Sequence, residues 1–293
     1  MKTLRIKAAA KLNFSLDILG IRPDGYHEMD MVMQTIDLFD DVELSKAGTI
    51  SVFSDGSPDG PENLAWKAAE AFFRAAEAFF RAAKCSGGAR IRLTKRIPAQ
   101  AGMAGGSADA AAVLIGLNAL YDARLSPEAL RDAGLSVGAD VPYCLIGGTA
   151  RVRGIGEIVE PMPPFLSGYL VVAKPATGIS TAEAFRRFDR AENLRHPDIA
   201  ALLSVMEKGQ LDALSLFMEN VLEQSEQNET VETLRQELLK NGALAARMTG
   251  SGSAVFGLFS EKEAASRCAV ALAGENRQIF VTKPYPKGIT LLP

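Results

Sequence analysis

The residues whose types and spacing most clearly suggest a chemical function form a glycine-rich segment, 98–109, that leads directly into an apolar, alanine-rich run. Glycines let backbone N–H groups approach an anion closely, and the N-terminus of a following helix adds partial positive charge. The segment therefore predicts a phosphate cradle made of Pro98, Ala99, Gln100, Ala101, Gly102, Met103, Ala104, Gly105, Gly106, Ser107 and Ala108. Its spacing is neither that of a P-loop nor that of a dinucleotide-binding fingerprint. A flexible loop that precedes a helix without any function is the alternative interpretation.

A second segment rich in glycine and hydroxyl groups interrupts the strand-like run 246–259 and consists of Gly250, Ser251, Gly252 and Ser253. In isolation it indicates either a loop that lines a ligand or a β-bulge or tight hairpin. Two such loops in one chain favour the interpretation that both line a nucleotide.

Two charged residues have unusual local surroundings. Lys11 follows three alanines in a strand-like run, which suits either a lysine at a strand edge or an ammonium that meets an anion. Asp140 lies in a turn between Gly138 and Pro142, where a carboxylate either forms an Asx turn or projects into a cleft. The residues alone leave both alternatives open at each position.

The composition favours a soluble chain that acts on small molecules. Of 293 residues, 47% are hydrophobic and 23% are charged, and the net charge of −3 provides no basic field for nucleic acid or an anionic membrane. Cys85, Cys144 and Cys268 have spacings that fit no zinc site or disulfide framework, which indicates reduced thiols. No stretch resembles a signal peptide or a membrane span, so we expect a cytoplasmic protein.

The pattern of apolar residues and turn signals predicts the elements that position these groups. We expect strands at 4–9, 12–19, 31–39, 41–46, 49–53, 89–94, 149–152, 157–159, 169–173 and 278–284, and a strand pair within 246–259. Helices are expected at 61–84, 107–121, 126–134, 181–187, 199–208, 211–222, 229–241 and from 261, with a tight loop at 138–146. This order indicates an α+β fold of two lobes rather than a doubly wound sheet.

The sequence AAEAFFR occurs twice in succession, at 68–74 and 75–81. Two copies are too few for a coiled coil. Because seven residues advance a helix by about two turns, the repeat predicts a lengthened core helix with all four of its phenylalanines on nearly one face. A surface that binds a partner is the alternative.

Several segments together resemble the successive motifs of the GHMP small-molecule kinases: 10–13, 22–27, 97–112, 138–142 and 248–259. The resemblance covers nearly the whole chain. It implies a first lobe at 1–158 with a ribosomal-protein-like βαβ topology, which carries the phosphate loop and catalytic residues. It implies a ferredoxin-like α/β second lobe at 159–293. It also implies phosphoryl transfer from ATP with Mg²⁺, whose protein ligands and the oligomeric state are not indicated.

The segment 22–27 is similar to that of the family members that phosphorylate the 2-hydroxyl of cytidine diphosphate methylerythritol in isoprenoid precursor biosynthesis. The resemblance then implies that Asp140 is the catalytic base and Lys11 its cationic partner. It assigns Tyr26 and His27 to the binding of the cytidine. It places Phe185 as a second aromatic residue against the base, and Phe188 is the alternative for that position. Asn13 is a candidate ligand of the erythritol hydroxyls, since it follows Lys11 by two residues on one strand face.

The phosphate loop departs from the family pattern at two positions. Ala104 replaces a glycine and Ala108 replaces the second of two serines, so Ser107 is the one hydroxyl left there. Three other functions compete with the main hypothesis. They are a GHMP kinase for mevalonate, homoserine or a sugar, a catalytically silent metabolite-binding relative, and an RNA-binding protein, which the acidic balance disfavours.

Overall fold

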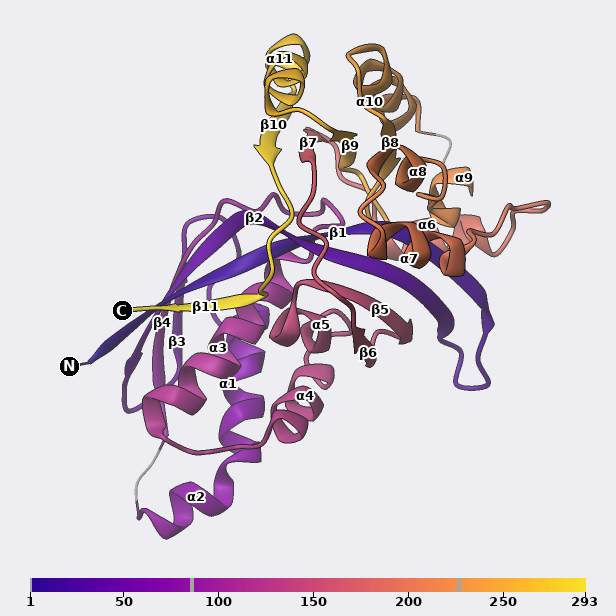
Figure 1. Cartoon of the computed structure of the whole chain (residues 1–293). Helices are drawn as coiled ribbons and strands as arrows, with labels where there is room; N and C mark the ends of the chain where they lie inside the picture. The colour runs from indigo at the N-terminus through magenta and orange to yellow at the C-terminus, as the bar shows by residue number, and fades with distance from the viewer. Residues whose placement is uncertain (1, 85–86, 226–227) are drawn as a thin grey trace.

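Two β-sheets form the framework of the computed structural model, which describes residues 2–84, 87–225 and 228–293 (Figure 1). The first sheet has the order β11-β1-β2-β4-β3, with β5 and β6 extending it from β2, and the second has the order β10-β7-β9-β8. The strands are β1 (Thr3–Ile21), β2 (His27–Lys46), β3 (Ser51–Ser54), β4 (Ala89–Thr94), β5 (Thr149–Gly154), β6 (Ile158–Pro161), β7 (Tyr169–Pro175), β8 (Ala245–Met248), β9 (Val255–Phe259), β10 (Arg277–Thr282) and β11 (Ile289–Leu292).

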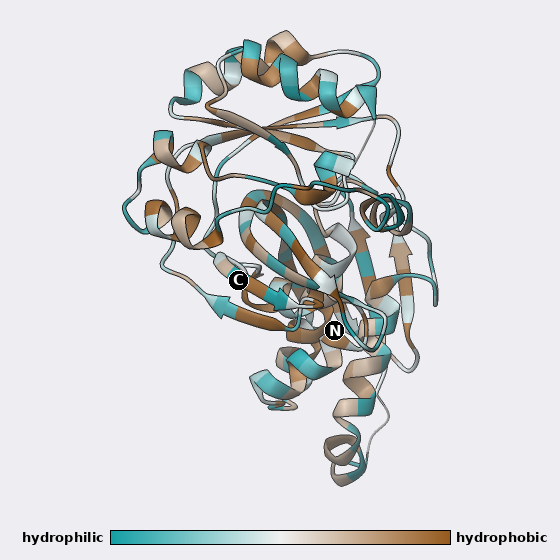
Figure 2. Ribbon diagram, turned by 90° about the vertical axis from the view of Figure 1, so that its right-hand side faces the viewer, coloured by the Kyte–Doolittle hydropathy of each residue, from teal (hydrophilic) through white to brown (hydrophobic). Residues whose placement is uncertain are grey.

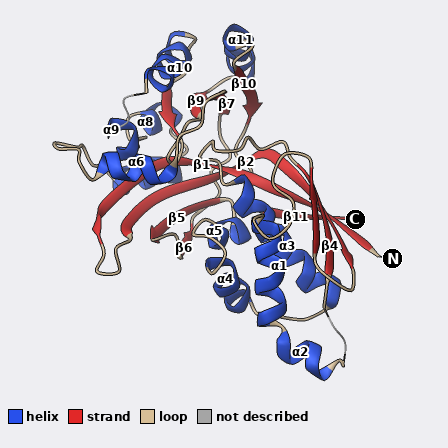
Figure 3. Cartoon of the chain, turned by 180° about the vertical axis from the view of Figure 1, so that it is seen from behind, coloured by secondary structure: helices blue, strands red, loops and turns tan. Residues whose placement is uncertain are grey.

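Helices cover these sheets in separate groups (Figure 3). Those of the N-terminal half, α1, α3, α4 and α5, lie together on one side of the long strands, and α10 and α11 pack on the second sheet. The helices are α1 (Leu64–Ala75), α2 (Glu77–Ala82), α3 (Gly105–Tyr121), α4 (Pro127–Leu135), α5 (Val141–Ile146), α6 (Thr181–Phe188), α7 (Ile199–Glu207), α8 (Leu211–Ser215), α9 (Val221–Ser225), α10 (Glu229–Lys240) and α11 (Lys262–Leu272).

The long strands β1 and β2 have apolar contacts on both faces, which explains their near-continuous burial. One face packs with Ile6 and Leu44 against α1 and α3, and the other packs with Phe14 and Ile36 against residues of the second sheet and α7. Hydrophobic residues accordingly run along the strands between the layers (Figure 2). A strand buried on both faces is well suited to hold a charged group such as Lys11 in a fixed place.

The two early strands expected at 4–9 and 12–19 are one strand, and the same is true of 31–39 and 41–46. β1 and β2 pair over almost their whole length, with register shifts between Ala9 and Lys11, between Asn13 and Ser15, and between Ile18 and Gly20. Such shifts are β-bulges, which bend a strand without ending it. Polar residues therefore do not mark strand ends here. One pairing is also parallel, that of β3 with β4.

The repeated heptad lies in the core, as the core interpretation predicts, but not in one continuous helix. The chain leaves helical geometry at Ala76, with φ −94° and ψ 11°, so α1 and α2 are separate. Phe72 and Phe80 are buried, and both contact Tyr121 of α3. The break turns α2 so that its phenylalanines close over this aromatic cluster.

Most other expected elements are present with small shifts in their ends, but three differ. The helix expected at 211–222 is interrupted, because buried Asn220 donates its side-chain amide to the carbonyl oxygens of Met248 and Gly250 between α8 and α9. The loop at 138–146 contains α5. Strand β11 has no counterpart among the expected elements.

Strand pairing crosses the proposed boundary between 1–158 and 159–293. β6 spans it and pairs with β5, and β11 pairs with β1, so the first sheet takes strands from both predicted parts. The α+β architecture with two sheets agrees with the prediction. Cys144 and Cys268 are free and buried, whereas Cys85 lies outside the described residues. Within those residues, no helix is both long enough and apolar enough to cross a bilayer.

Candidate active site

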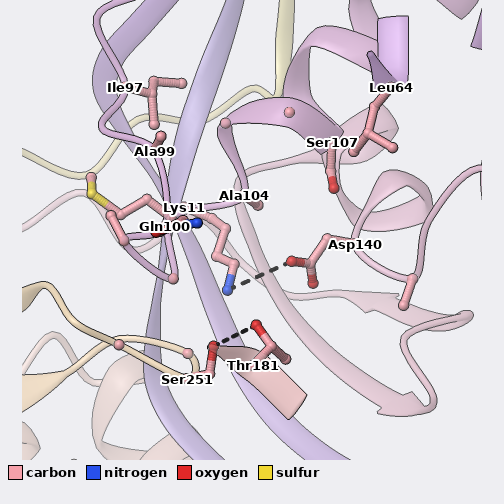
Figure 4. Close-up of a pocket in the computed structure, with 18 of the residues that line it drawn as sticks. Lys11, Leu64, Ile97, Ala99, Gln100, Ala104, Ser107, Asp140, Thr181 and Ser251 are labelled. Carbon is pink, nitrogen blue, oxygen red and sulfur yellow. Dashed lines mark hydrogen bonds and ion pairs between the residues drawn. The ribbon is translucent and has the colours of Figure 1, made fainter. Parts of the chain in front are cut away.

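A cavity of about 900 Å³ lies where the middle of β1, the segment before α3 and the start of α6 meet (Figure 4). Most of the residues singled out in the sequence line it. They are Lys11, Asn13, Tyr26, His27, the whole run from Pro98 to Ser107, Asp140, Phe185, Gly250, Ser251 and Gly252. Ala108 and Ser253 do not. Ala108 is buried in the core, and the Ser253 hydroxyl donates to the carbonyl oxygen of Thr177 at 2.6 Å.

The phosphate loop reaches α3 through two non-glycine residues in left-handed geometry, Gln100 (φ 50°) and Ala104 (φ 57°). The first turn of α3, with Gly105, Gly106 and Ser107, borders the cavity. A helix N-terminus presents unpaired N–H groups and partial positive charge. This side of the cavity is thus built to receive an anion.

The two glycine-rich loops touch each other. Gly102 has φ +70°, and a Cβ there would lie 2.0 Å from the carbonyl oxygen of Thr249. The Thr249 hydroxyl donates to the carbonyl oxygen of Gly102 at 3.3 Å. The backbone N–H of Ser253 donates to the carbonyl oxygen of Gln100 at 3.4 Å. The second loop therefore holds the first in place, in addition to lining the cavity.

Lys11 and Asp140 are brought together, as the resemblance implies. The Lys11 Nζ lies 3.9 Å from the Asp140 Oδ2 (Figure 4). Nζ also donates to the Asn13 Oδ1 at 2.7 Å, and the Lys11 backbone N–H donates to the carbonyl oxygen of Met103 at 3.2 Å. The ammonium is buried, whereas the Asp140 side chain is 33% exposed at the start of α5. A molecule in the cavity can reach the carboxylate while the ammonium stays fixed behind it.

A second buried charge cluster was missed by the sequence reasoning. Lys95, at the end of β4, forms ion pairs with Asp40 of β2 and Asp109 of α3, and the Asp40 Oδ1 also accepts the backbone N–H groups of Arg96 and Ile97. These contacts clamp both ends of the phosphate loop. Asp40 and Asp109, acidic residues within otherwise apolar elements, were the available signal for this cluster. Their pairing with Lys95 could not be predicted because the three residues lie far apart in the sequence.

Burial sets the electrostatics of this cluster. It raises the pKa of Asp109 to about 7, against the opposing effect of Lys95. Burial by itself would lower the pKa of Lys95, but Asp109 and Asp40 raise it overall. The Oδ1 of Asp109 has no hydrogen-bond partner within the described chain, so one oxygen of this buried carboxyl group beside the phosphate loop is unpaired.

The far end of the cavity is aromatic. The His27 ring lies 4.7 Å from that of Phe185 and 6.2 Å from that of Phe188, the latter edge-on. Phe185 lines the cavity, and Phe188 does not, so of the two registers Phe185 is the one that faces the cavity. Tyr26 is 61% exposed at the tip of the β1–β2 hairpin. The three cavity-lining rings offer flat surfaces, and Tyr26 and His27 add polar groups at their edges.

A hydroxyl pair also missed in the sequence lies between the two ends. The Thr181 Oγ1 at the start of α6 is 2.9 Å from the Ser251 Oγ of the second loop (Figure 4). Both residues line the cavity. They connect α6, which carries Phe185, to the loop that supports the phosphate cradle.

The residues present fit a magnesium ion that is bound mainly through phosphates. Within the described ranges, no cluster of three or more acidic, histidine or cysteine side chains could hold a metal alone. Mg²⁺ usually takes one or two protein oxygens and completes its shell with phosphates and water. The Ser107 hydroxyl and the Asp140 carboxylate supply such oxygens on the phosphate side of the cavity.

Comparisons with known proteins agree with this geometry. The sequence profile of the GHMP kinases N-terminal domain matches residues 63–148, and that of the GHMP kinases C-terminal domain matches residues 191–277. The 4-diphosphocytidyl-2-C-methyl-D-erythritol kinase of Clostridium tetani is 41% identical over 285 residues, covering 96% of this chain and 99% of the relative. The enzyme of the same name from Carboxydothermus hydrogenoformans is 44% identical over 292 residues, covering 98% and 99%.

Solved structures show the same fold. A crystal structure of 4-(cytidine 5'-diphospho)-2C-methyl-D-erythritol kinase aligns with a TM-score of 0.77 and 32% identity, covering 96% of this chain and 98% of the other. The homoserine kinase of Cytophaga hutchinsonii aligns with a TM-score of 0.75 at 18% identity, covering 100% and 98%, a likeness of fold alone. The predicted fold class and the resemblance are thus confirmed. The chain belongs to the GHMP kinases and, within them, to the family of the 4-diphosphocytidyl-2-C-methyl-D-erythritol kinases.

Proposed function

We propose that this protein transfers the γ-phosphoryl group of ATP to the 2-hydroxyl of 4-diphosphocytidyl-2-C-methyl-D-erythritol. The products are the 2-phosphate and ADP, and the reaction belongs to isoprenoid precursor biosynthesis by the methylerythritol phosphate pathway. One observation carries the proposal: a single cavity holds a glycine-rich anion cradle, a Lys–Asp pair and an aromatic cluster at its other end. A substrate with an alcohol at one end and a nucleobase at the other fits this arrangement.

In this function Asp140 accepts the proton of the 2-hydroxyl as the oxygen attacks the γ-phosphorus. A carboxylate that is open to the cavity can reach that hydroxyl. Lys11, buried and 3.9 Å from the carboxylate, stabilises negative charge on the attacking oxygen. The Asn13 Oδ1 accepts a hydrogen bond from the Lys11 ammonium and so fixes its direction, and the place of Asn13 in the cavity suits it to contact the erythritol.

The phosphate loop and the N-terminus of α3 bind the triphosphate of ATP through backbone N–H groups. Ser107 and Asp140 line this side of the cavity and would hold Mg²⁺ together with phosphate oxygens, and the ion would supply neutralisation of the phosphate charge. Tyr26, His27 and Phe185 bind the cytosine. Both reactants are small metabolites, and we place the reaction in the cytoplasm.

Product analysis with a panel of acceptors tests the function. Purified protein is supplied with Mg²⁺-ATP and, in separate reactions, with the cytidine substrate, its 2-deoxy analogue, mevalonate and homoserine. We expect ADP formation with the cytidine substrate alone. Turnover of mevalonate or homoserine in its place would assign another kinase activity. Binding of ATP and of the cytidine substrate without turnover would identify a silent relative.

A further inference from the structure

The side chain of Asp189 makes a contact that the proposed catalytic scheme leaves unused. Its Oδ1 lies 2.7 Å from the Nε2 of His27, although the two residues are 162 positions apart in the chain. Asp189 directly follows the last residue of α6, and His27 is the first residue of β2. The contact therefore joins the hairpin tip to the helix that carries Phe185.

We propose that Asp189 is the residue that makes this site specific for cytosine, because it fixes which nitrogen of His27 carries the proton. This inference rests on the proposed function. An ionised carboxylate can only accept hydrogen bonds, so the neutral His27 ring must place its proton on Nε2. Nδ1 then carries a lone pair and can only accept.

The free edge of His27 is thereby matched to one base. Nδ1 has no hydrogen-bond partner in the described parts of the chain, and the ring lines the cavity. Cytosine presents an exocyclic amine that donates, whereas uracil presents a carbonyl oxygen at the same position. An accepting Nδ1 attracts the amine and repels the carbonyl, and a buried polar group that lacks its partner is costly.

The surroundings hold the His27 ring in the orientation that this readout needs. Phe185 and Phe188 bracket it at centroid distances of 4.7 and 6.2 Å. The hairpin turn before it is closed by the backbone N–H of Arg22, which donates to the carbonyl oxygen of Tyr26 at 2.7 Å. Since α6 supplies both aromatic contacts and Asp189 follows it, one element sets the position and the protonation of the ring.

Substitutions of Asp189 test the proposal through base discrimination. Asp189→Asn keeps the size of the side chain, but an amide can donate as well as accept, so it allows either tautomer of His27. Asp189→Ala removes the contact. Glu192→Gln, an exposed acidic position three residues later, is the matched control. The measurement is kcat/KM for the cytidine substrate and for its uridine analogue at about pH 8.5, where histidine side chains are ordinarily neutral.

We expect the wild-type protein and Glu192→Gln to prefer the cytidine form. In Asp189→Asn and Asp189→Ala the ratio of the two kcat/KM values should fall about tenfold or more, while the KM for ATP is unchanged. A merely structural role of Asp189 would lower both kcat/KM values equally, and an unchanged ratio would overturn the proposal. Equal use of the two bases by the wild-type protein would also overturn it, yet would leave the kinase function intact.

The tautomer is also observable without turnover. The ¹⁵N chemical shifts of the His27 ring, assigned by comparison with a His27→Gln sample, should show a protonated Nε2 and an unprotonated Nδ1 in the wild-type protein. Asp189→Asn should move both shifts toward a mixture of tautomers. A wild-type ring protonated on Nδ1 would refute the proposal even if the protein had no kinase activity at all.

Discussion

Asp140 and Lys11 form a pair in which the two charges have unequal access to the cavity. The ammonium has its position fixed by Asn13 and by the buried strand around it, whereas the carboxylate is one-third exposed. A base must meet its substrate, and a stabilising cation need not. The geometry thus suits Asp140 to the role of base and Lys11 to the role of stabilising cation before any ligand is bound.

Asp140→Asn tests the base. The substitution preserves size and hydrogen bonding but removes the proton acceptor, so kcat should fall about 100-fold or more while the KM values change little. Steady-state kinetics measure both parameters. Asp132→Asn, on the exposed surface of α4, should behave as the wild-type protein does. A normal kcat in Asp140→Asn would exclude Asp140 from the reaction.

Asp109 should make the stability of the protein depend on pH. Its pKa is raised from 3.8 to about 7 by burial. Between these values the folded chain keeps a proton that the unfolded chain has released, so this group lowers the free energy of unfolding as the pH rises from about 4 to about 7. The stabilisation is complete below this window and absent above it.

Urea unfolding of Asp109→Asn at about pH 5 and pH 8 measures this contribution. The amide resembles the protonated acid, so the variant should gain stability relative to the wild-type protein as the pH rises across the window. The wild-type protein, unfolded in urea at the same pH values, provides the reference for the effect of all other titratable groups on stability. The same stability difference between the two proteins at both pH values would show that Asp109 does not titrate in this window.

At the scale of elements, the phosphate loop depends on contacts with a segment about 150 residues away in the chain. Gly102 leaves no room for a side chain beside Thr249. A substitution there must move one loop or the other. The Gly106 position, by contrast, lies in the first turn of α3 and requires no positive φ, and a Cβ there would meet the Leu64 side chain at 3.1 Å rather than backbone.

Gly102→Ala should therefore raise the KM for ATP about tenfold or more, because strain at positive φ adds to the collision with the Thr249 carbonyl. Gly242→Ala is the control: its φ of +92° imposes similar strain, but nothing lies within 4 Å of the new Cβ. It should lower stability and leave the KM for ATP unchanged. If Gly102→Ala binds ATP normally, the contact between the loops does not shape the cradle.

The sequence was informative about elements with local signals and poor at those set by distant partners. Capping by Ser126 and the glycine-rich loop before α3 are local, and both are present in the structure. The continuity of β1 through Lys11 depends on pairing with β2, and α5 behind Asp140 depends on packing against α3. The Lys95 cluster joins three separate elements. Composition and spacing carry no record of such partners.

At the scale of the whole molecule, the chain returns from the second sheet to the first. After β10 it passes along β2, where the carbonyl oxygen of Tyr285 accepts the Thr35 hydroxyl at 2.6 Å, and it ends as β11 beside β1. The same hydroxyl accepts the backbone N–H of Gly148 at 2.8 Å. Thr35 thus joins three distant segments behind the site.

Thr35→Val should lower the free energy of unfolding by about 1–3 kcal/mol, because it keeps the side-chain shape but leaves the buried N–H of Gly148 without its partner and removes one of the two side-chain hydrogen bonds to the Tyr285 carbonyl. Urea unfolding measures the loss. Thr230→Val, on the exposed side of α10, should change stability by less than about 0.5 kcal/mol. Equal effects at the two positions would mean that the Thr35 hydroxyl does not hold the C-terminal segment.

The long strand β1 has one more consequence. It carries Lys11 in its middle, pairs with β2 from there to Ile21, and continues into the hairpin that ends at His27. The hydrogen-bonded backbone of this strand therefore fixes the distance between the reacting end of the cavity and its aromatic end. We therefore expect that a compound with the correct base and the correct alcohol, joined by one phosphate instead of two, reaches either end of the cavity but not both at once. The site would then select a substrate by the distance between its base and its alcohol as well as by the identity of these two groups.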